Sequence, residues 1–184
     1  MNQKLTDQIK ITLMDLLTEG AGLEQLCNRA SEFLEQPLAV AAIDRTILAR
    51  SGNYTRELAE EYSGCFPVSS QQEALERVRY IDEKLALRHA FVITFPILHC
   101  PHVVCGCFRE SIMLGMLDVP VTGPRENMQA VVEMLEFLAP YFQLSLRLNK
   151  DVIDRMTFSM QMYLSGLLNG DPVEWVHTHR LYDS

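Results

Sequence analysis

The sequence predicts an α+β fold, in which a mostly antiparallel sheet of about five strands is flanked by helices and followed by a long C-terminal helix. Two observations carry this prediction. Apolar residues recur at steps of three and four towards both ends of the chain, which is typical of amphipathic helices. Between these regions lie short apolar segments of strand length, and their short connections favour antiparallel pairing.

The first third of the chain predicts two helices and a strand hairpin. Apolar positions at helical spacing place helices over 4–18 and 23–35, and Pro37 cannot continue the second helix. The period then changes. Residues 38–43 and 46–51 are short apolar segments separated by an Asp-Arg pair, which favours a hairpin.

The next stretch is less regular. A short helix is expected over 55–62. Ser70 and Glu73 have the spacing of a capping box, which predicts a helix over 71–80. For residues 79–88, the sequence does not distinguish between helix, strand and loop.

Three strands and a long helix are expected after this stretch. The segments 91–98, 103–110 and 112–119 have strand length and strand-forming residues. An apolar stripe then follows helical spacing over 125–168, and Pro140 should bend that helix. One helix of this length would measure about 65 Å. Part of it should therefore pack on the first helices or on a second copy of the chain.

Composition restricts the classes of function. The 184-residue chain has a formal charge of −8, which weighs against binding of a nucleic-acid phosphate backbone by this segment. No apolar segment is long enough to span a membrane, and the N-terminus lacks a signal-peptide pattern, so we expect a cytoplasmic protein. The five cysteines are odd in number and are expected to be buried thiols.

Four segments together resemble a known family. They are EFLEQPLAVAAIDRTILARSG (32–52), FPIL (95–98), GMLDVPVTGPRENMQAVVEMLEFLAPYFQLSL (115–146) and YLSGLLNGDP (163–172). With the order of elements, they resemble a GAF domain, and in detail the N-terminal GAF-like sensor domain of PucR/CdaR-type bacterial transcription regulators. The stretch HCPHVVCGCFRESIML, which follows Leu98, is longer than the hairpin expected in that family.

The resemblance implies a ligand-sensing regulatory domain and not an enzyme. Residues 1–149 would form the sensor with its N-terminal helices, and 150–184 a helical linker. Such a domain binds a small-molecule effector and dimerises through its N-terminal and C-terminal helices, while DNA binding belongs to another part of the regulator. An interaction-only scaffold, with a similar fold but a filled interior, is the alternative without a ligand.

In GAF-like folds the ligand lies between the sheet and irregular connections, here 52–70 and 79–90. Pockets need apolar walls with a few placed polar groups. We therefore expect the ligand-binding residues among the polar and aromatic side chains of these segments, together with Arg109: Tyr54, Phe66, Arg79, Tyr80, Arg88, His89 and Arg109. The competing interpretation is that the arginines are solvated surface charges.

A cluster of two histidines and three cysteines lies within nine residues: His99, Cys100, His102, Cys105 and Cys107. On a strand, the last two cysteines share a face, and sulfur with imidazole suits Zn²⁺. The alternative is that the cysteines act as small apolar side chains in a strand and that the histidines are solvated. A third hypothesis is a thiol enzyme similar to GAF-type free methionine sulfoxide reductases, in which Arg109 or a histidine would lower a thiol pKa.

Overall fold

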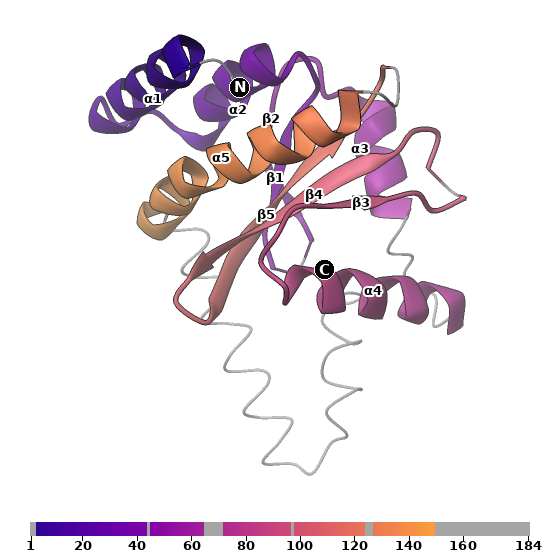
Figure 1. The fold of residues 1–184 in the computed structure, drawn as a ribbon. Helices are drawn as coiled ribbons and strands as arrows, with labels where there is room; N and C mark the ends of the chain where they lie inside the picture. Colours follow the sequence, from indigo (N-terminus) through magenta and orange to yellow (C-terminus); the bar gives the residue numbers. More distant parts are fainter. Residues whose placement is uncertain (1–2, 44, 65–71, 97, 124–126, 150–184) are drawn as a thin grey trace, which may run out of the picture.

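A computed structural model confirms the predicted α+β class (Figure 1). It describes residues 3–43, 45–64, 72–96, 98–123 and 127–149. The elements follow the order α1 (Gln3–Thr18), α2 (Leu23–Leu34), β1 (Ala39–Ala41), β2 (Ile47–Arg50), α3 (Arg56–Gly64), α4 (Gln72–Leu85), β3 (Phe91–Ile93), β4 (His102–Arg109), β5 (Ile112–Pro120) and α5 (Met128–Leu148). Within these residues, no helix combines the length and the apolar character needed to cross a membrane.

The five strands form one antiparallel sheet in the order β2-β1-β5-β4-β3. β1 pairs with β5, so the first hairpin closes against a strand that comes much later in the chain. The longest pairing joins β4 to β5, and it contains an irregularity between Cys107 and Phe108. β1 and β2 are joined by a tight turn in which Arg45 adopts a φ of 66° and donates its N–H to the Ala42 carbonyl.

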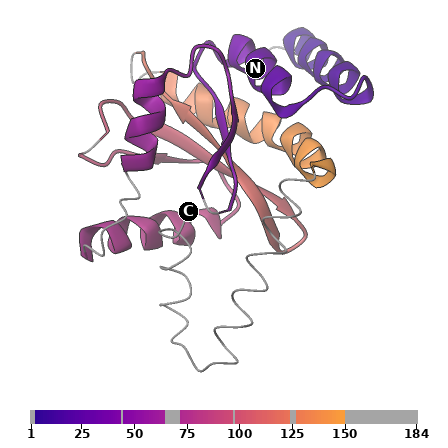
Figure 2. The same cartoon turned by 180° about the vertical axis from the view of Figure 1, so that it is seen from behind.

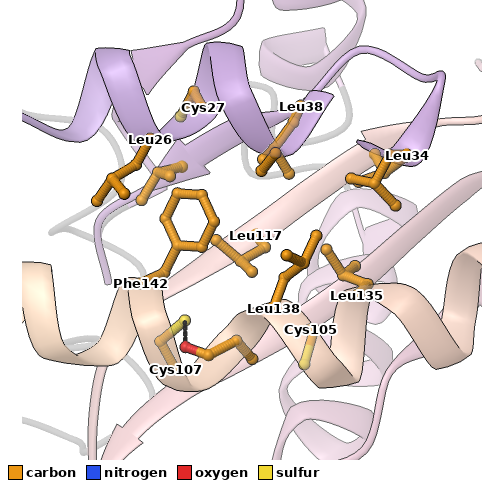
Figure 3. Close-up of a cluster of buried hydrophobic side chains, with 14 of the residues drawn as sticks. Leu26, Cys27, Leu34, Leu38, Cys105, Cys107, Leu117, Leu135, Leu138 and Phe142 are labelled. Atoms are coloured by element: carbon orange, nitrogen blue, oxygen red, sulfur yellow. Dashed lines mark hydrogen bonds between the residues drawn. The ribbon is translucent and has the colours of Figure 1, made fainter. Parts of the chain in front are cut away.

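One face of the sheet packs against α2 and α5 and forms the larger apolar core (Figure 3). Leu26 of α2, Leu117 of β5 and Leu138 of α5 are fully buried there, as is Phe142. Burying a leucine or phenylalanine side chain contributes about 1.5–3 kcal/mol. α1 contacts α2 and α5 on their outer side, as Figure 1 shows.

The opposite face is covered by α3 and α4 (Figure 2). Tyr62 of α3 and Ile81 and Leu85 of α4 pack against Val104 and Met116 of the sheet. The two faces follow from strand alternation, because successive side chains of a strand point to opposite sides. The sheet is therefore the middle of three layers.

Several boundaries differ from those predicted. α4 continues to Leu85, so most of the open region 79–88 is helical. β3 has three residues instead of the eight predicted, because a turn closed by the Leu98 N–H and the Phe95 carbonyl takes the chain away from the sheet. α5 ends at Leu148, where Asn149 is extended (φ −80°, ψ 116°), so the helix expected over 125–168 does not continue through this residue. The later part of that prediction and the linker 150–184 lie outside the described residues.

Candidate functional site

Three buried polar side chains meet on the α3/α4 side of the sheet. His102 of β4 and Asp118 of β5 share this face with Val104, because Val104 lies directly opposite Asp118 and two residues from His102. Tyr54 reaches them from the connection between β2 and α3. Its hydroxyl donates to Asp118 Oδ2 at 2.8 Å, and His102 Nδ1 lies 2.9 and 3.1 Å from the two Asp118 oxygens. We call these three residues the polar cluster.

Burial and hydrogen bonding define the polar cluster. When Asp118 is ionised, its carboxylate only accepts hydrogen bonds, and His102 Nδ1 is then the donor in this pair. The side chains of His102 and Asp118 are both fully buried, at 0 % exposure. No described residue gives His102 Nε2 a hydrogen-bond partner. A buried polar atom in this state costs about 1–3 kcal/mol relative to a bonded one.

Other charged groups are buried beside α3 and α4. Arg45, in the β1–β2 turn, forms an ion pair with Asp82 of α4, and its side chain is 7 % exposed. Glu61 of α3 accepts the backbone N–H of His99 and contacts its ring, and the Glu61 side chain is 11 % exposed. Buried polar groups usually satisfy one another or bind a ligand or water. This side of the sheet therefore carries much of the buried polarity of the described chain.

A second feature is a hollow of about 460 Å³ at the outer edge of β4. β3 pairs with β4 only over 102–104, whereas β4 continues to Arg109. The hollow opens beside the part of β4 that extends beyond β3. Its lining comes from the α4–β3 connection, from β4 and the turn after it, and from α5: Arg88, His89, Cys105, Gly106, Phe108, Glu110, Glu136, Ala139, Pro140, Gln143 and Arg147. We call it the β4-edge hollow.

The structure divides the predicted ligand-binding residues among several places. Tyr54 belongs to the polar cluster, whereas Arg88 and His89 line the β4-edge hollow. Arg79 and Tyr80 lie on the exposed side of α4, where Arg79 pairs with Glu83.

Arg109 is exposed at the end of β4. Phe66 lies outside the described residues. The structure thus does not bring the predicted ligand-binding residues together into one site.

The histidine and cysteine cluster is also divided. Cys105 and Cys107 share a face as predicted, but they point into the apolar core beneath α5 (Figure 3), whereas His102 points to the other side of the sheet. His99 is 90 % exposed and contacts Glu61. Among the described residues, no three histidine, cysteine or acidic side chains gather in a way that would hold a metal ion.

Both strand cysteines are poor nucleophiles. Burial raises the pKa of Cys105 to about 12, with a smaller contribution from Glu136, and it raises the pKa of Cys107 well above its usual range. The Cys107 Sγ lies 3.9 Å from the Ala139 carbonyl oxygen. The dashed line at Cys107 in Figure 3 marks this contact. A reactive cysteine needs a lowered pKa and a neighbouring cation. This environment therefore argues against the thiol-enzyme hypothesis at these two positions.

Asp118 was not among the residues predicted from the sequence, and neither was the role of His102 as its partner. A signal for Asp118 was present, because it is an isolated carboxylate in the apolar strand segment 112–119. Charged side chains are rarely buried unless they are paired.

No protein-family model matches the chain, and a search of curated proteins also finds no match.

Proposed function

We propose that the chain is a small-molecule-sensing regulatory domain of the GAF-like class that acts as a dimer. The observation that carries this proposal is the polar cluster, in which His102 Nε2 is buried without a hydrogen-bond partner among the described residues. A ligand that bonds to this atom recovers the cost of burying it. The helix-flanked antiparallel sheet is also the architecture that the family resemblance implies.

The sheet offers a path from a bound ligand to the dimer. On β5, Asp118 belongs to the polar cluster, while the preceding Leu117 packs into the core shared with α5. A ligand that shifts β5 therefore also acts on the packing of α5. Such a shift changes the relative stability of two arrangements of the helices. We place the domain in a transcription regulator on the strength of the resemblance to PucR/CdaR-type sensor domains.

The proposed dimer surface lies on α1 and the end of α5. These two helices are in contact and carry exposed large apolar side chains: Leu5, Ile11, Met14, Leu144 and Leu148. Ile11 is 63 % exposed and Leu148 is 79 % exposed. Light scattering should give the mass of a dimer, and an Ile11→Glu variant should be a monomer. A monomeric wild-type protein would contradict the dimeric part of the proposal.

Ligand binding is tested with a thermal-shift screen of small polar metabolites. A ligand at one hundred times its Kd stabilises the protein by about 2.7 kcal/mol. The Kd of each hit is then measured for the wild type and for the His102→Asn variant. The asparagine amide N–H can replace Nδ1 as the donor to Asp118, but the variant has no atom at the Nε2 position. We expect about tenfold weaker binding, the effect of losing about 1.4 kcal/mol.

The matched control is His99→Asn, because the imidazole of His99 is 90 % exposed. This variant should bind each hit as the wild type does. A screen without a hit, or a screen in which every hit binds His102→Asn with unchanged affinity, would contradict the proposed sensing site; a single amino-acid hit of that kind would not. Circular dichroism confirms that each variant keeps the secondary structure of the wild type.

An interaction-only module is the second candidate, and one observation favours it. The apolar side chains of Tyr62, Ile81, Leu85 and Met116 pack together between the sheet and α3/α4. If they occupy the space that a ligand would need, the domain only joins two chains. A stable dimer combined with a screen that yields no ligand would support this second function.

A further inference from the structure

The β4-edge hollow differs in place and chemistry from the polar cluster. It lies beyond the last residue of β4 that pairs with β3, and α5 forms one of its walls. The residues that α5 contributes recur at steps of one to four and lie on one side of the helix: Glu136, Ala139, Pro140, Gln143 and Arg147. This wall is therefore acidic at its start, apolar in the middle and basic at its end.

Two contacts fix how α5 runs along β4. Near the start of the wall, Glu136 accepts the N–H of Ala90, the residue just before β3. One turn later, the Ala139 carbonyl lies 3.9 Å from the Sγ of Cys107. Since Phe91 pairs with Val104, α5 and β4 run in the same general direction along the hollow.

This direction places two opposite charges at the same end of the hollow. Arg147 lies eight residues beyond Ala139 on α5, or about 12 Å at 1.5 Å per residue. Arg109, the last residue of β4, lies two residues beyond Cys107, or about 7 Å at 3.3 Å per residue, and Glu110 follows it in the turn. The Arg147 and Glu110 side chains both line the hollow, yet within the described residues neither forms an ion pair.

The other end of the β4-edge hollow and its middle are lined by different groups. Glu136 is already held by Ala90 and by His89, whose Nδ1 lies 3.3 Å away. The guanidinium of Arg88 lies 5.1 Å from the centre of the Phe108 ring. Apolar lining comes from Phe108, whose ring lies on the α4 side of β4 beside Leu85, and from Ala139 and Pro140 of α5 on the other side of the strand edge.

Gly106 allows this aromatic wall to form. A Cβ atom at Gly106 would lie 2.5 Å from the Phe108 ring. The ring can therefore lie across the strand only because position 106 has no side chain. Arg88 covers the ring and adopts a φ of 60°, a conformation that is uncommon for residues other than glycine.

We propose that the β4-edge hollow binds a free amino acid with an apolar side chain. Arg147 binds the α-carboxylate, because a guanidinium matches a carboxylate with two parallel hydrogen bonds. Glu110 accepts the α-ammonium group. The apolar side chain of the ligand packs against Phe108 and Pro140, and a volume of about 460 Å³ is in the range of small-molecule sites.

Calorimetry and saturation-transfer NMR on the full chain test this proposal with four probes: L-valine, L-leucine, L-methionine and L-phenylalanine. At least one should bind at millimolar concentration or below. For L-phenylalanine, the matched analogues are phenethylamine, which lacks the carboxylate, and 3-phenylpropionate, which lacks the ammonium group. Where L-phenylalanine binds, each analogue should bind at least tenfold more weakly; otherwise the corresponding analogues of the best probe are used.

The variants Arg147→Gln and Glu110→Gln should each weaken binding about tenfold. Arg79→Gln is the matched control, because Arg79 is 83 % exposed on α4 and forms an ion pair with Glu83. Failure of all four probes, equal binding of an analogue, or an equal effect of Arg79→Gln overturns the proposal. His102→Asn should leave the affinity for the amino acid unchanged, so this site and the polar cluster can fail independently.

Discussion

Removing one oxygen atom from Tyr54 tests how the buried carboxylate of Asp118 is held. In the Tyr54→Phe variant, Asp118 Oδ2 loses a donor at 2.8 Å. Tyr54 is 1 % exposed and Asp118 is 0 % exposed, so water is poorly placed to replace the hydroxyl. A hydrogen bond to a charged group contributes about 1.5–3 kcal/mol to stability. We therefore expect the free energy of unfolding to fall by about 2 kcal/mol.

The assay is urea denaturation followed by circular dichroism, with a thermal scan as a second measurement. For a domain of this size, the expected loss lowers Tm by about 4–8 °C. Tyr80→Phe is the matched control, because Tyr80 is 39 % exposed and its loss of a hydroxyl should change stability by no more than about 0.5 kcal/mol.

A double-mutant cycle separates the hydrogen bond from other effects of the substitution. In an Asp118→Asn background the acceptor is neutral, so Tyr54→Phe should cost less than it does in the wild type. If Tyr54→Phe costs no more than Tyr80→Phe, or if its cost is the same in both backgrounds, then the Asp118 carboxylate does not depend on Tyr54 and the reasoning is refuted.

Two further predictions test the sheet. Gly115→Ala should lower the free energy of unfolding in urea by about 1–3 kcal/mol, because its Cβ would lie 2.6 Å from the Ala41 carbonyl oxygen. Gly123→Ala is the control and should cost less than about 1 kcal/mol, because the atom nearest to its Cβ would be 3.8 Å away. Equal costs would contradict the close approach of β1 and β5. A second test uses iodoacetamide labelling of the native protein followed by peptide mass spectrometry. The partly buried Cys100 should react well before Cys105, whose buried thiol has a pKa of about 12. Rapid labelling of Cys105 would show that this strand opens.

Local patterns predicted most of the elements correctly. The amphipathic spacing before Pro37 yields α1 and α2 close to their observed bounds. The apolar segments after residue 100 yield β4 and β5, which pair as the hairpin that their short connection favours. These elements form through contacts between residues that are near in sequence or through a single apolar face. Both features can be recognised from the spacing of apolar residues in the sequence.

The polar cluster could not be predicted in the same way. His102 and Asp118 are 16 residues apart, and they meet because the register places Val104 opposite Asp118. A change of one residue in that register would put the two side chains on opposite faces. The spacing of histidines and cysteines left a metal site open beside the alternative of apolar buried thiols, whereas strand alternation places His102 and Cys105 on opposite faces of the sheet.

The alternation along β5 also explains how one sheet can combine a stable core with buried polarity. Leu117 and Val119 pack on the α2/α5 side, and Asp118 between them points to the α3/α4 side. The apolar contacts of Leu117 and Val119 fix the strand, and the fixed strand holds the carboxylate where Tyr54 and His102 can reach it. Burial of a charged pair is costly unless the surrounding structure supplies good geometry. The larger core therefore provides the rigidity on which the polar cluster depends, so substitutions beneath α5 that loosen β5 should weaken the cluster without touching it.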